Sequence, residues 1–253
     1  MSNYLIKKVS ENIDEKGYAA MEESDTLSIN ANANAKSTVT LDGVIVKSFG
    51  LFALLLISSY LGWQTPITLV ALAGIFISFI TILVLAFKPL LGNVLAPIYS
   101  LAMGYSLGYI SLYFNSTYPG IVINAVSVTF VIFATFLFLY ISRIVRVTSK
   151  MRSIVLVATL GVGIFYLVNF LYSLITKNTL PLIWDNSLAG ILFSLAVSAL
   201  ASYNLFIDFD NIERAIEIKA DSKYEWALSA GLLATLVWVY IEILRLLSKL
   251  RSR

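Results

Sequence analysis

The chain has 253 residues, of which 58% are apolar and 13% charged, and its net charge at pH 7 is +3. Soluble domains are roughly 45–50% apolar and about 25% charged, so charges this sparse cannot cover a water-facing surface. The composition indicates a protein embedded in lipid. The basic residues gather in loops and at helix ends, as membrane topology requires, and this distribution argues against nucleic acid as a partner. The chain contains no cysteine and no histidine, which excludes disulfides, thiolate metal sites and a histidine pH switch.

The first 43 residues are predicted to form a cytoplasmic tail that is partly disordered. Residues 1–21 are compatible with a short surface helix or a frayed tail, and residues 28–35 form a low-complexity Asn/Ala linker. The first 25 residues contain one apolar triplet, whereas a secretory leader needs about 7–15 apolar residues in a row. We therefore expect the first membrane span to direct insertion.

Residues 44–250 are predicted to form one transmembrane domain. It contains seven apolar runs of about the length that crosses a bilayer. They lie at about 45–63, 66–87, 94–113, 119–141, 153–175, 187–207 and 226–247. These runs lack the alternation of barrel strands, and only helices or closed barrels satisfy the backbone in lipid. The predicted fold class is an all-α membrane protein, a seven-helix bundle.

Basic residues predict the orientation of the bundle. The loop between the fourth and fifth runs carries four basic residues and no acid: Arg143, Arg146, Lys150 and Arg152. By the positive-inside rule this loop and the N-terminus are cytoplasmic, which suits a multi-pass protein of a bacterial plasma membrane. Seven full spans would then place the C-terminus outside, although its last residues are also basic. Seven spans are favoured, and a shallow or re-entrant last segment is the alternative.

Ionisable residues within the apolar runs are the first candidates for function, because they are costly in a bilayer. The sixth run ends with Asp208 and Asp210, and Asn204 precedes Asp208 by four residues. Residues two apart on a helix point about 200° apart, so only one of the two aspartates can face a given pore. The alternative is that both are solvated carboxylates at a cytoplasmic helix end.

The seventh run carries a second set of candidates on one helical stripe. The stripe comprises Gly231, Thr235, Trp238, Glu242 and Arg245. Glu242 and Arg245 are an i, i+3 pair that can neutralise each other. This pair is either a structural ion pair near the interface or a latch that lines an ion path. Trp238 is expected to be a packing or interfacial aromatic.

Enzyme motifs are missing from the sequence. No HExxH, GxSxG or Walker loop occurs, and an intramembrane aspartyl protease would need two aspartates on facing helices. We therefore expect no enzymatic activity and no cofactor.

Three stretches together resemble the Bax inhibitor-1 family, in its bacterial branch with an N-terminal extension. They are residues 107–111 running on to Tyr118-Pro119-Gly120-Ile121-Val122, residues 208–213, and Glu225-Trp226 through residues 235–247. The resemblance implies a seven-helix bundle with the last helix at its centre and a pH-sensitive calcium leak. It implies that Asp208 is the first of two aspartates that share a proton, and that Arg245 is the family's basic residue near the end of helix seven.

The sequence departs from the family at the second aspartate, where Thr235 stands. Asp208 is thus expected to titrate nearly alone, with Lys88 or Arg245 as basic neighbours, and to bind calcium transiently as the transported ion. The competing view is that Asp210 or Glu242 has taken the second role. A membrane-embedded regulator that contacts another membrane protein is the alternative function, and the sequence specifies no oligomeric state.

Overall fold

The computed structural model describes residues 37–177 and 185–252, so the predicted surface helix and Asn/Ala linker of the tail lie outside the described residues. Within the described part, seven helices are long and apolar enough to cross a membrane. The predicted all-α, seven-helix fold class is confirmed.

The helices follow one another with short connections. They are α2 (Leu41–Gln64), α3 (Thr68–Phe87), α4 (Gly92–Thr117), α5 (Ile121–Ile141), α6 (Ser149–Thr176), α8 (Leu188–Glu217) and α9 (Tyr224–Arg251), with a 3-10 turn, η1 (Pro89–Leu91), before α4. Side chains of Thr40, Thr148 and Ser187 cap the first turns of α2, α6 and α8 by accepting a backbone N–H. Capping residues of this kind satisfy amides that have no partner within the helix.

One predicted boundary is wrong by ten residues. The sixth run was expected to end at residue 207, but α8 continues to Glu217. The additional turns are polar and leave the apolar zone, and they are held by ion pairs of Glu213 with Arg143 and of Asp210 with Arg214. Hydropathy marks where an apolar run ends, whereas the helix ends where its hydrogen bonding ends.

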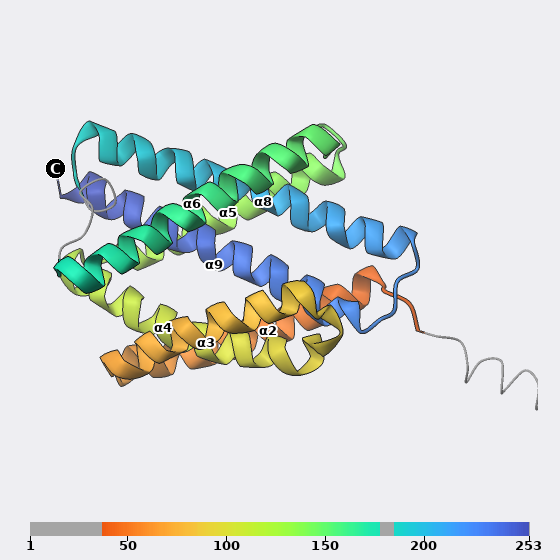
Figure 1. The fold of residues 1–253 in the computed structure, drawn as a ribbon, viewed down its shortest axis with the longest axis horizontal. Coiled ribbons are helices and arrows are strands. Elements are labelled where there is room, and N and C mark those ends of the chain that lie inside the picture. The colour runs from red at the N-terminus through yellow and green to blue at the C-terminus, as the bar shows by residue number, and fades with distance from the viewer. Residues whose placement is uncertain (1–36, 178–184, 253) are drawn as a thin grey trace, which may run out of the picture. The chain divides into compact units, whose positions relative to one another are not determined.

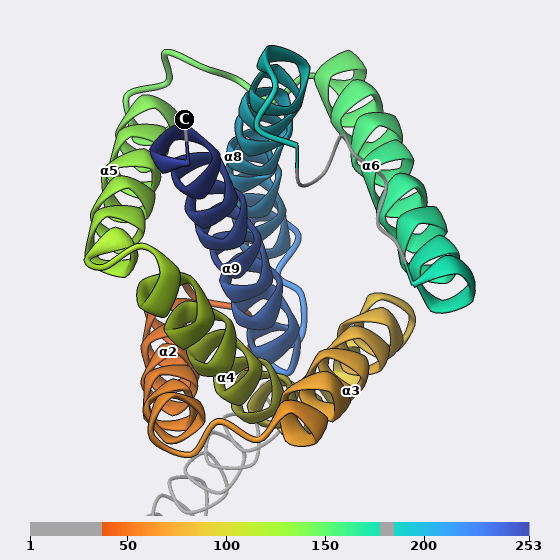
Figure 2. The ribbon, with the colours of Figure 1, turned by 90° about the vertical axis from the view of Figure 1, so that its left-hand side faces the viewer.

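Helix α9 runs through the middle of the bundle and packs against α2, α4, α5 and α8 (Figures 1 and 2). Helices α2 and α4 approach closely, because a Cβ atom on Gly62 or Gly108 would collide with the backbone of Tyr105 or Ser59 on the facing helix. Small residues allow such approach in membrane bundles. Helix α6 lies at the periphery of the bundle (Figure 2).

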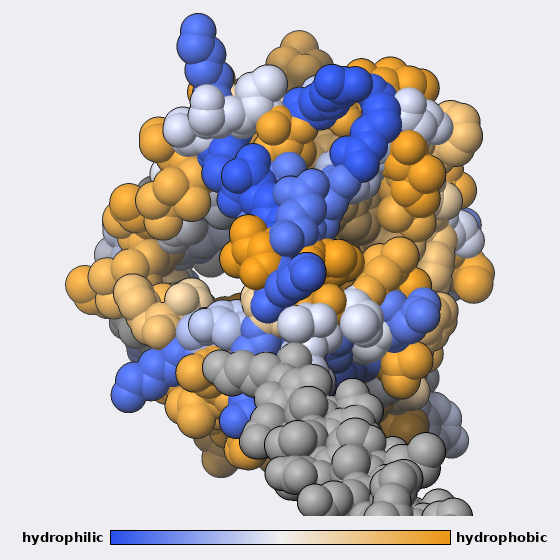
Figure 3. Space-filling view, turned by 90° about the vertical axis from the view of Figure 1, so that its right-hand side faces the viewer, coloured by the Kyte–Doolittle hydropathy of each residue, from blue (hydrophilic) through white to orange (hydrophobic). Residues whose placement is uncertain are grey.

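One end of the bundle gathers the start of α2, the α5–α6 loop and the α8–α9 loop. Val39 donates its amide to the Ala220 carbonyl at 2.8 Å, and Arg143 pairs with Glu213. Figure 3 shows hydrophilic side chains gathered on this end, with apolar side chains around it. The start of α2 and the basic α5–α6 loop therefore lie on the same side, as the charge pattern predicts.

The C-terminal end of α9 lies at the opposite end of the bundle. Lys249 Nζ donates to the Gly190 carbonyl at 2.9 Å, and Arg251 donates to the Pro119 carbonyl at 2.7 Å. Helix α9 is long and apolar enough to cross a membrane and extends from one end of the bundle to the other, as the favoured seven spans require. These two basic residues of the tail thus bond backbone carbonyls of the α4–α5 connection and of the first turn of α8.

Candidate functional site

Asp208 lies where α8 meets α9. Its Oδ2 atom is buried and has no hydrogen-bond partner among the described residues. The hydroxyl of Thr235, on α9, is the hydrogen-bonding group that faces the Asp208 carboxylate. Gly231, one turn earlier on α9, leaves space beside it, since a Cβ atom there would lie 4.0 Å from Asp208 Oδ1. A buried carboxylate oxygen without a partner calls for an explanation, and a bound cation, water or proton would satisfy it.

Asp208 also lies between two contacts that α8 makes with α6. Asn204, four residues before it, donates to Thr159 Oγ1 at 3.0 Å. Asn211, three residues after it, accepts from Arg152 at 2.8 Å. Residues at this 4-3 spacing share one row on a helix. The carboxylate is therefore set in the seam of α6, α8 and α9.

Asp210 points elsewhere. Its Oδ2 atom pairs with Arg152 and accepts from Arg214 Nε at 2.7 Å. Helix α8 remains helical through both aspartates, so their directions diverge as the sequence spacing predicts. Asp208 and Asp210 are not brought together, and Asp210 belongs to an ion-pair network at the end of the bundle.

That network borders a pocket of about 560 Å³ between the α5–α6 loop and the end of α8. Charges of both signs line it: Arg143, Arg146, Asp210, Glu213, Arg214 and Glu217. Tyr140 donates to Glu213, which also pairs with Arg143. Tyr140 and Glu213 are not among the candidates from the sequence, because nothing in the local pattern shows which basic loop residue an acid on α8 will meet.

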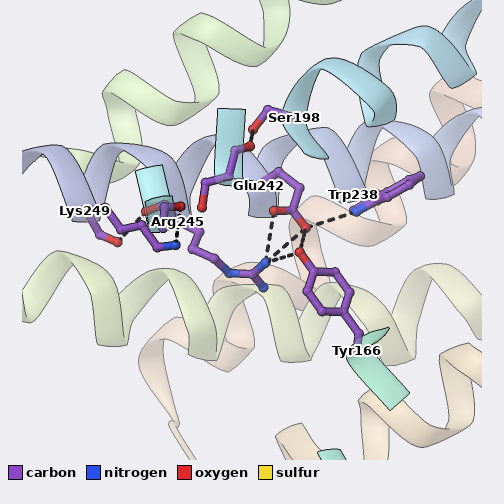
Figure 4. Close-up of polar contacts among 9 residues, drawn as sticks. Tyr166, Ser198, Trp238, Glu242, Arg245 and Lys249 are labelled. Carbon is purple, nitrogen blue, oxygen red and sulfur yellow. Dashed lines mark hydrogen bonds and ion pairs between the residues drawn. The ribbon is translucent and has the colours of Figure 1, made fainter. Parts of the chain in front are cut away.

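The second candidate set forms a polar cluster in the other half of α9 (Figure 4). Glu242 is 1% exposed, and its carboxylate lies 3.0 Å from Arg245 Nη1. Tyr166 of α6 donates to Glu242 at 2.8 Å and accepts from Arg245 at 2.6 Å. Trp238 Nε1 also donates to Glu242, at 3.1 Å. The expected i, i+3 pair is present, and it is buried in the protein and bonded to a neighbouring helix.

Two members of this cluster were not foreseen in these roles. Tyr166 was not a candidate, and its only signal is a phenol within an apolar run. Trp238 was expected to be a packing or interfacial aromatic, yet it is a hydrogen-bond donor to a buried carboxylate. Buried charges need several donors, so an intramembrane glutamate is the signal that could have prompted a search for them.

The Asp208 site and the Glu242 cluster are separate. Thr235 and Glu242 are seven residues apart on α9, which is about 10 Å along the axis. Among the described residues, Asp208 has neither Arg245 nor Lys88 as a hydrogen-bond or ion-pair partner, and Arg245 pairs with Glu242. The expectation that one of them is the basic neighbour of Asp208 is therefore wrong.

The Asp208 site offers one carboxylate and one hydroxyl. Calcium prefers six to eight oxygen ligands, and the described residues contain no group of three or more His, Cys, Asp or Glu side chains that could hold a metal ion. This arrangement suits brief contact with a passing cation or uptake of a proton better than tight metal binding.

A protein-family model described as Bax inhibitor 1 like matches residues 15–252, nearly the whole chain. Neither the curated proteins nor the solved structures give a match.

Proposed function

Because this chain belongs to the Bax inhibitor 1 like family, we propose that it is a pH-sensitive cation leak channel that carries calcium and has Asp208 on its path. The family is not a known enzyme family, in keeping with the lack of catalytic motifs in the sequence. We place the protein in a bacterial plasma membrane with its N-terminus in the cytoplasm.

The observation that carries this proposal is the Asp208 carboxylate where α8 meets α9, whose buried Oδ2 atom has no hydrogen-bond partner among the described residues. Ionisable groups inside a membrane are expensive, so they mark ion or proton pathways. Asp210 and Glu242 are each neutralised by arginines, whereas Asp208 is not.

Calcium flux into liposomes that contain the purified protein tests the proposal. Asp208→Asn removes the charge while keeping the shape, and we expect the flux to fall markedly. The matched control is Asp42→Asn in the exposed first turn of α2, which should leave the flux unchanged. A protein that conducts no cation above protein-free liposomes between about pH 5 and pH 8 would contradict the channel, and would favour a membrane-embedded regulator.

The pH dependence of that flux tests the role of Thr235. A single carboxylate titrates as one group, whereas two carboxylates in contact titrate as a coupled pair. We expect a shallow profile with about one proton, which Asp208→Asn abolishes. Thr235→Asp should steepen the profile or move its midpoint, because position 235 faces Asp208.

The competing view is that Asp210 or Glu242 supplies the second acid. It predicts about two coupled protons in the natural protein, and about one after Asp210→Asn or Glu242→Gln. A natural profile of that kind would show that the partner of Asp208 is not missing.

A further inference from the structure

Helix α6 is poorly packed for a span of this bundle. Among its described side chains, Val155 is the one that is buried. Many of its apolar residues are exposed to the surroundings of the bundle: Ile154, Leu156, Val157, Leu160, Ile164, Leu167, Val168 and Leu171. In a bilayer such surfaces gain little from packing on another helix, because lipid tails are as apolar as leucine. Apolar contact alone therefore holds α6 weakly.

Polar contacts hold α6 in place, and they form three clasps. The inner clasp joins Arg152 to Asp210 and Asn211. The middle clasp joins Thr159 to Asn204. The outer clasp joins Tyr166 to Glu242 and Arg245. All three tie α6 to α8 or α9.

The clasps frame the Asp208 carboxylate. The inner and middle clasps engage Asn211 and Asn204, which flank Asp208 on the same row of α8. Asp208 therefore lies on the row of α8 that α6 approaches on either side of it. Water that reaches the hydrogen bonds between α6 and α8 weakens them, because it competes for the same donors and acceptors.

We infer that α6 is a movable wall of the bundle, and that its displacement from α8 and α9 uncovers Asp208. This inference rests on the proposed function, since it names the element that controls access to the same carboxylate. Opening breaks the three clasps and leaves the packing of α9 with α2, α4 and α5 intact.

Distances between spin labels test the movement without requiring conduction. The natural chain has no cysteine, so Leu160→Cys on α6 and Ile57→Cys on α2, both exposed, give one clean pair in the full-length protein in liposomes. The control pair is Ile57→Cys with Val131→Cys on α5, also exposed.

We expect two distances for the α6 pair and one for the control pair. Arg152→Gln, which breaks the inner clasp, should raise the share of the longer distance at least twofold. A single narrow distance for the α6 pair that Arg152→Gln leaves unchanged would overturn the inference, whether or not the protein conducts.

A reversible lock tests the consequence for flux. Thr159→Cys with Asn204→Cys replaces the middle clasp by a pair that a short thiol cross-linker can bridge. We expect calcium flux of the double variant to fall at least tenfold on cross-linking and to return on reduction, whereas the cross-linker should not change the flux of either single variant. The control lock is Ala71→Cys with Ser106→Cys, whose native side chain and carbonyl lie 2.8 Å apart between α3 and α4.

The outcomes separate the two proposals. If the protein conducts but cross-linking α6 to α8 does not change the flux, the movable wall is refuted and the channel proposal is unaffected. The same holds if cross-linking α3 to α4 lowers the flux equally. A protein that does not conduct refutes the channel, and the spin-label distances then decide whether α6 moves.

Discussion

Helices α6 and α9 look alike by composition and differ completely in their place in the molecule. Both are long and apolar enough to cross a membrane, and α6 is the more apolar of the two. Yet among the described side chains of α6 only Val155 is buried, whereas α9 buries many, among them Leu233, Val237 and Leu244. The more apolar helix lies outside and the less apolar one lies in the centre, as Figure 2 shows.

The reason is the solvent. In water an apolar surface drives a helix into the core, but in lipid that drive is absent, and small or polar residues decide which surfaces meet. Helix α9 carries buried Ser229, Glu242 and Lys249, which form hydrogen bonds with α2, α6 and α8 respectively. Helix α6 offers a few polar side chains on one side and apolar residues elsewhere, so it is attached at points.

The largest difference in stability between α9 and α6 is expected when the Glu242 carboxylate of α9 is removed. Glu242→Leu removes the buried carboxylate that pairs with Arg245 and accepts from Tyr166 and Trp238, and it should cost about 3–5 kcal/mol, as when other buried pairs lose one member. Equilibrium unfolding in mixed micelles measures this loss. On α6, Lys150→Leu at an exposed position should change stability by less than about 0.5 kcal/mol.

The double variant Glu242→Leu/Arg245→Leu checks the cause. It should be more stable than Glu242→Leu alone, because both members of the buried pair are then replaced by apolar side chains. If both variants lose equal stability, the effect is one of packing around Tyr166 and Trp238.

Glycine positions give the next largest contrast. Gly108→Ala on α4 should cost about 1–3 kcal/mol, because its Cβ atom collides with the backbone of α2. Gly163→Ala on α6 meets no atom within 4 Å, and should be neutral or stabilise by up to about 1 kcal/mol. Unfolding of the two variants measures both values. Equal losses would show that α6 is packed as tightly as the centre.

The clasps should each be worth less. Tyr166→Phe removes the phenol that bonds Glu242 and Arg245, and should cost about 0.6–1.7 kcal/mol, the size of interhelical hydrogen bonds in membranes. The control is Tyr172→Phe, on the same helix and 41% exposed, for which we expect no change. A loss for Tyr172→Phe as large as for Tyr166→Phe would mean that the outer clasp contributes nothing specific.

Thiol labelling tests on which side of the membrane α6 begins, without altering stability. Ser149→Cys at the start of α6 should react with a membrane-impermeant thiol reagent in inverted vesicles and not in intact cells, since the basic α5–α6 loop is expected in the cytoplasm. Labelling from outside intact cells would reverse the assigned orientation of every span.

Local pattern was sufficient for much of the fold. Each apolar run, such as residues 119–141, is long enough to cross a bilayer, so the number of helices follows from length and hydropathy. The Glu242–Arg245 pair follows from i, i+3 spacing, and the divergence of Asp208 from Asp210 follows from the helical repeat. These features depend on residues close together in the chain.

Contacts between distant segments could not be predicted in this way. Nothing near Tyr166 in the sequence tells that it will reach Glu242, 76 positions away. The expected approach of Lys88 or Arg245 to Asp208 failed for the same reason, since reach depends on the level and rotation of each helix. These are set by close approaches such as Gly108 against Ser59.

By itself, the sequence determined that this is a membrane bundle of seven helices, because apolar runs without strand alternation can satisfy their backbone hydrogen bonds in lipid only as helices. It also determined that Asp208 and Asp210 on α8 face in different directions, because they are two residues apart on a helix. The family resemblance already implies that the last helix is central and that position 235 lies opposite Asp208. The tertiary structure alone decided that α6 is peripheral and meets α8 and α9 through Arg152, Thr159 and Tyr166. Hydropathy carries no information on that order, because lipid and protein interior are equally apolar, and only the pairing of small and polar side chains distinguishes them.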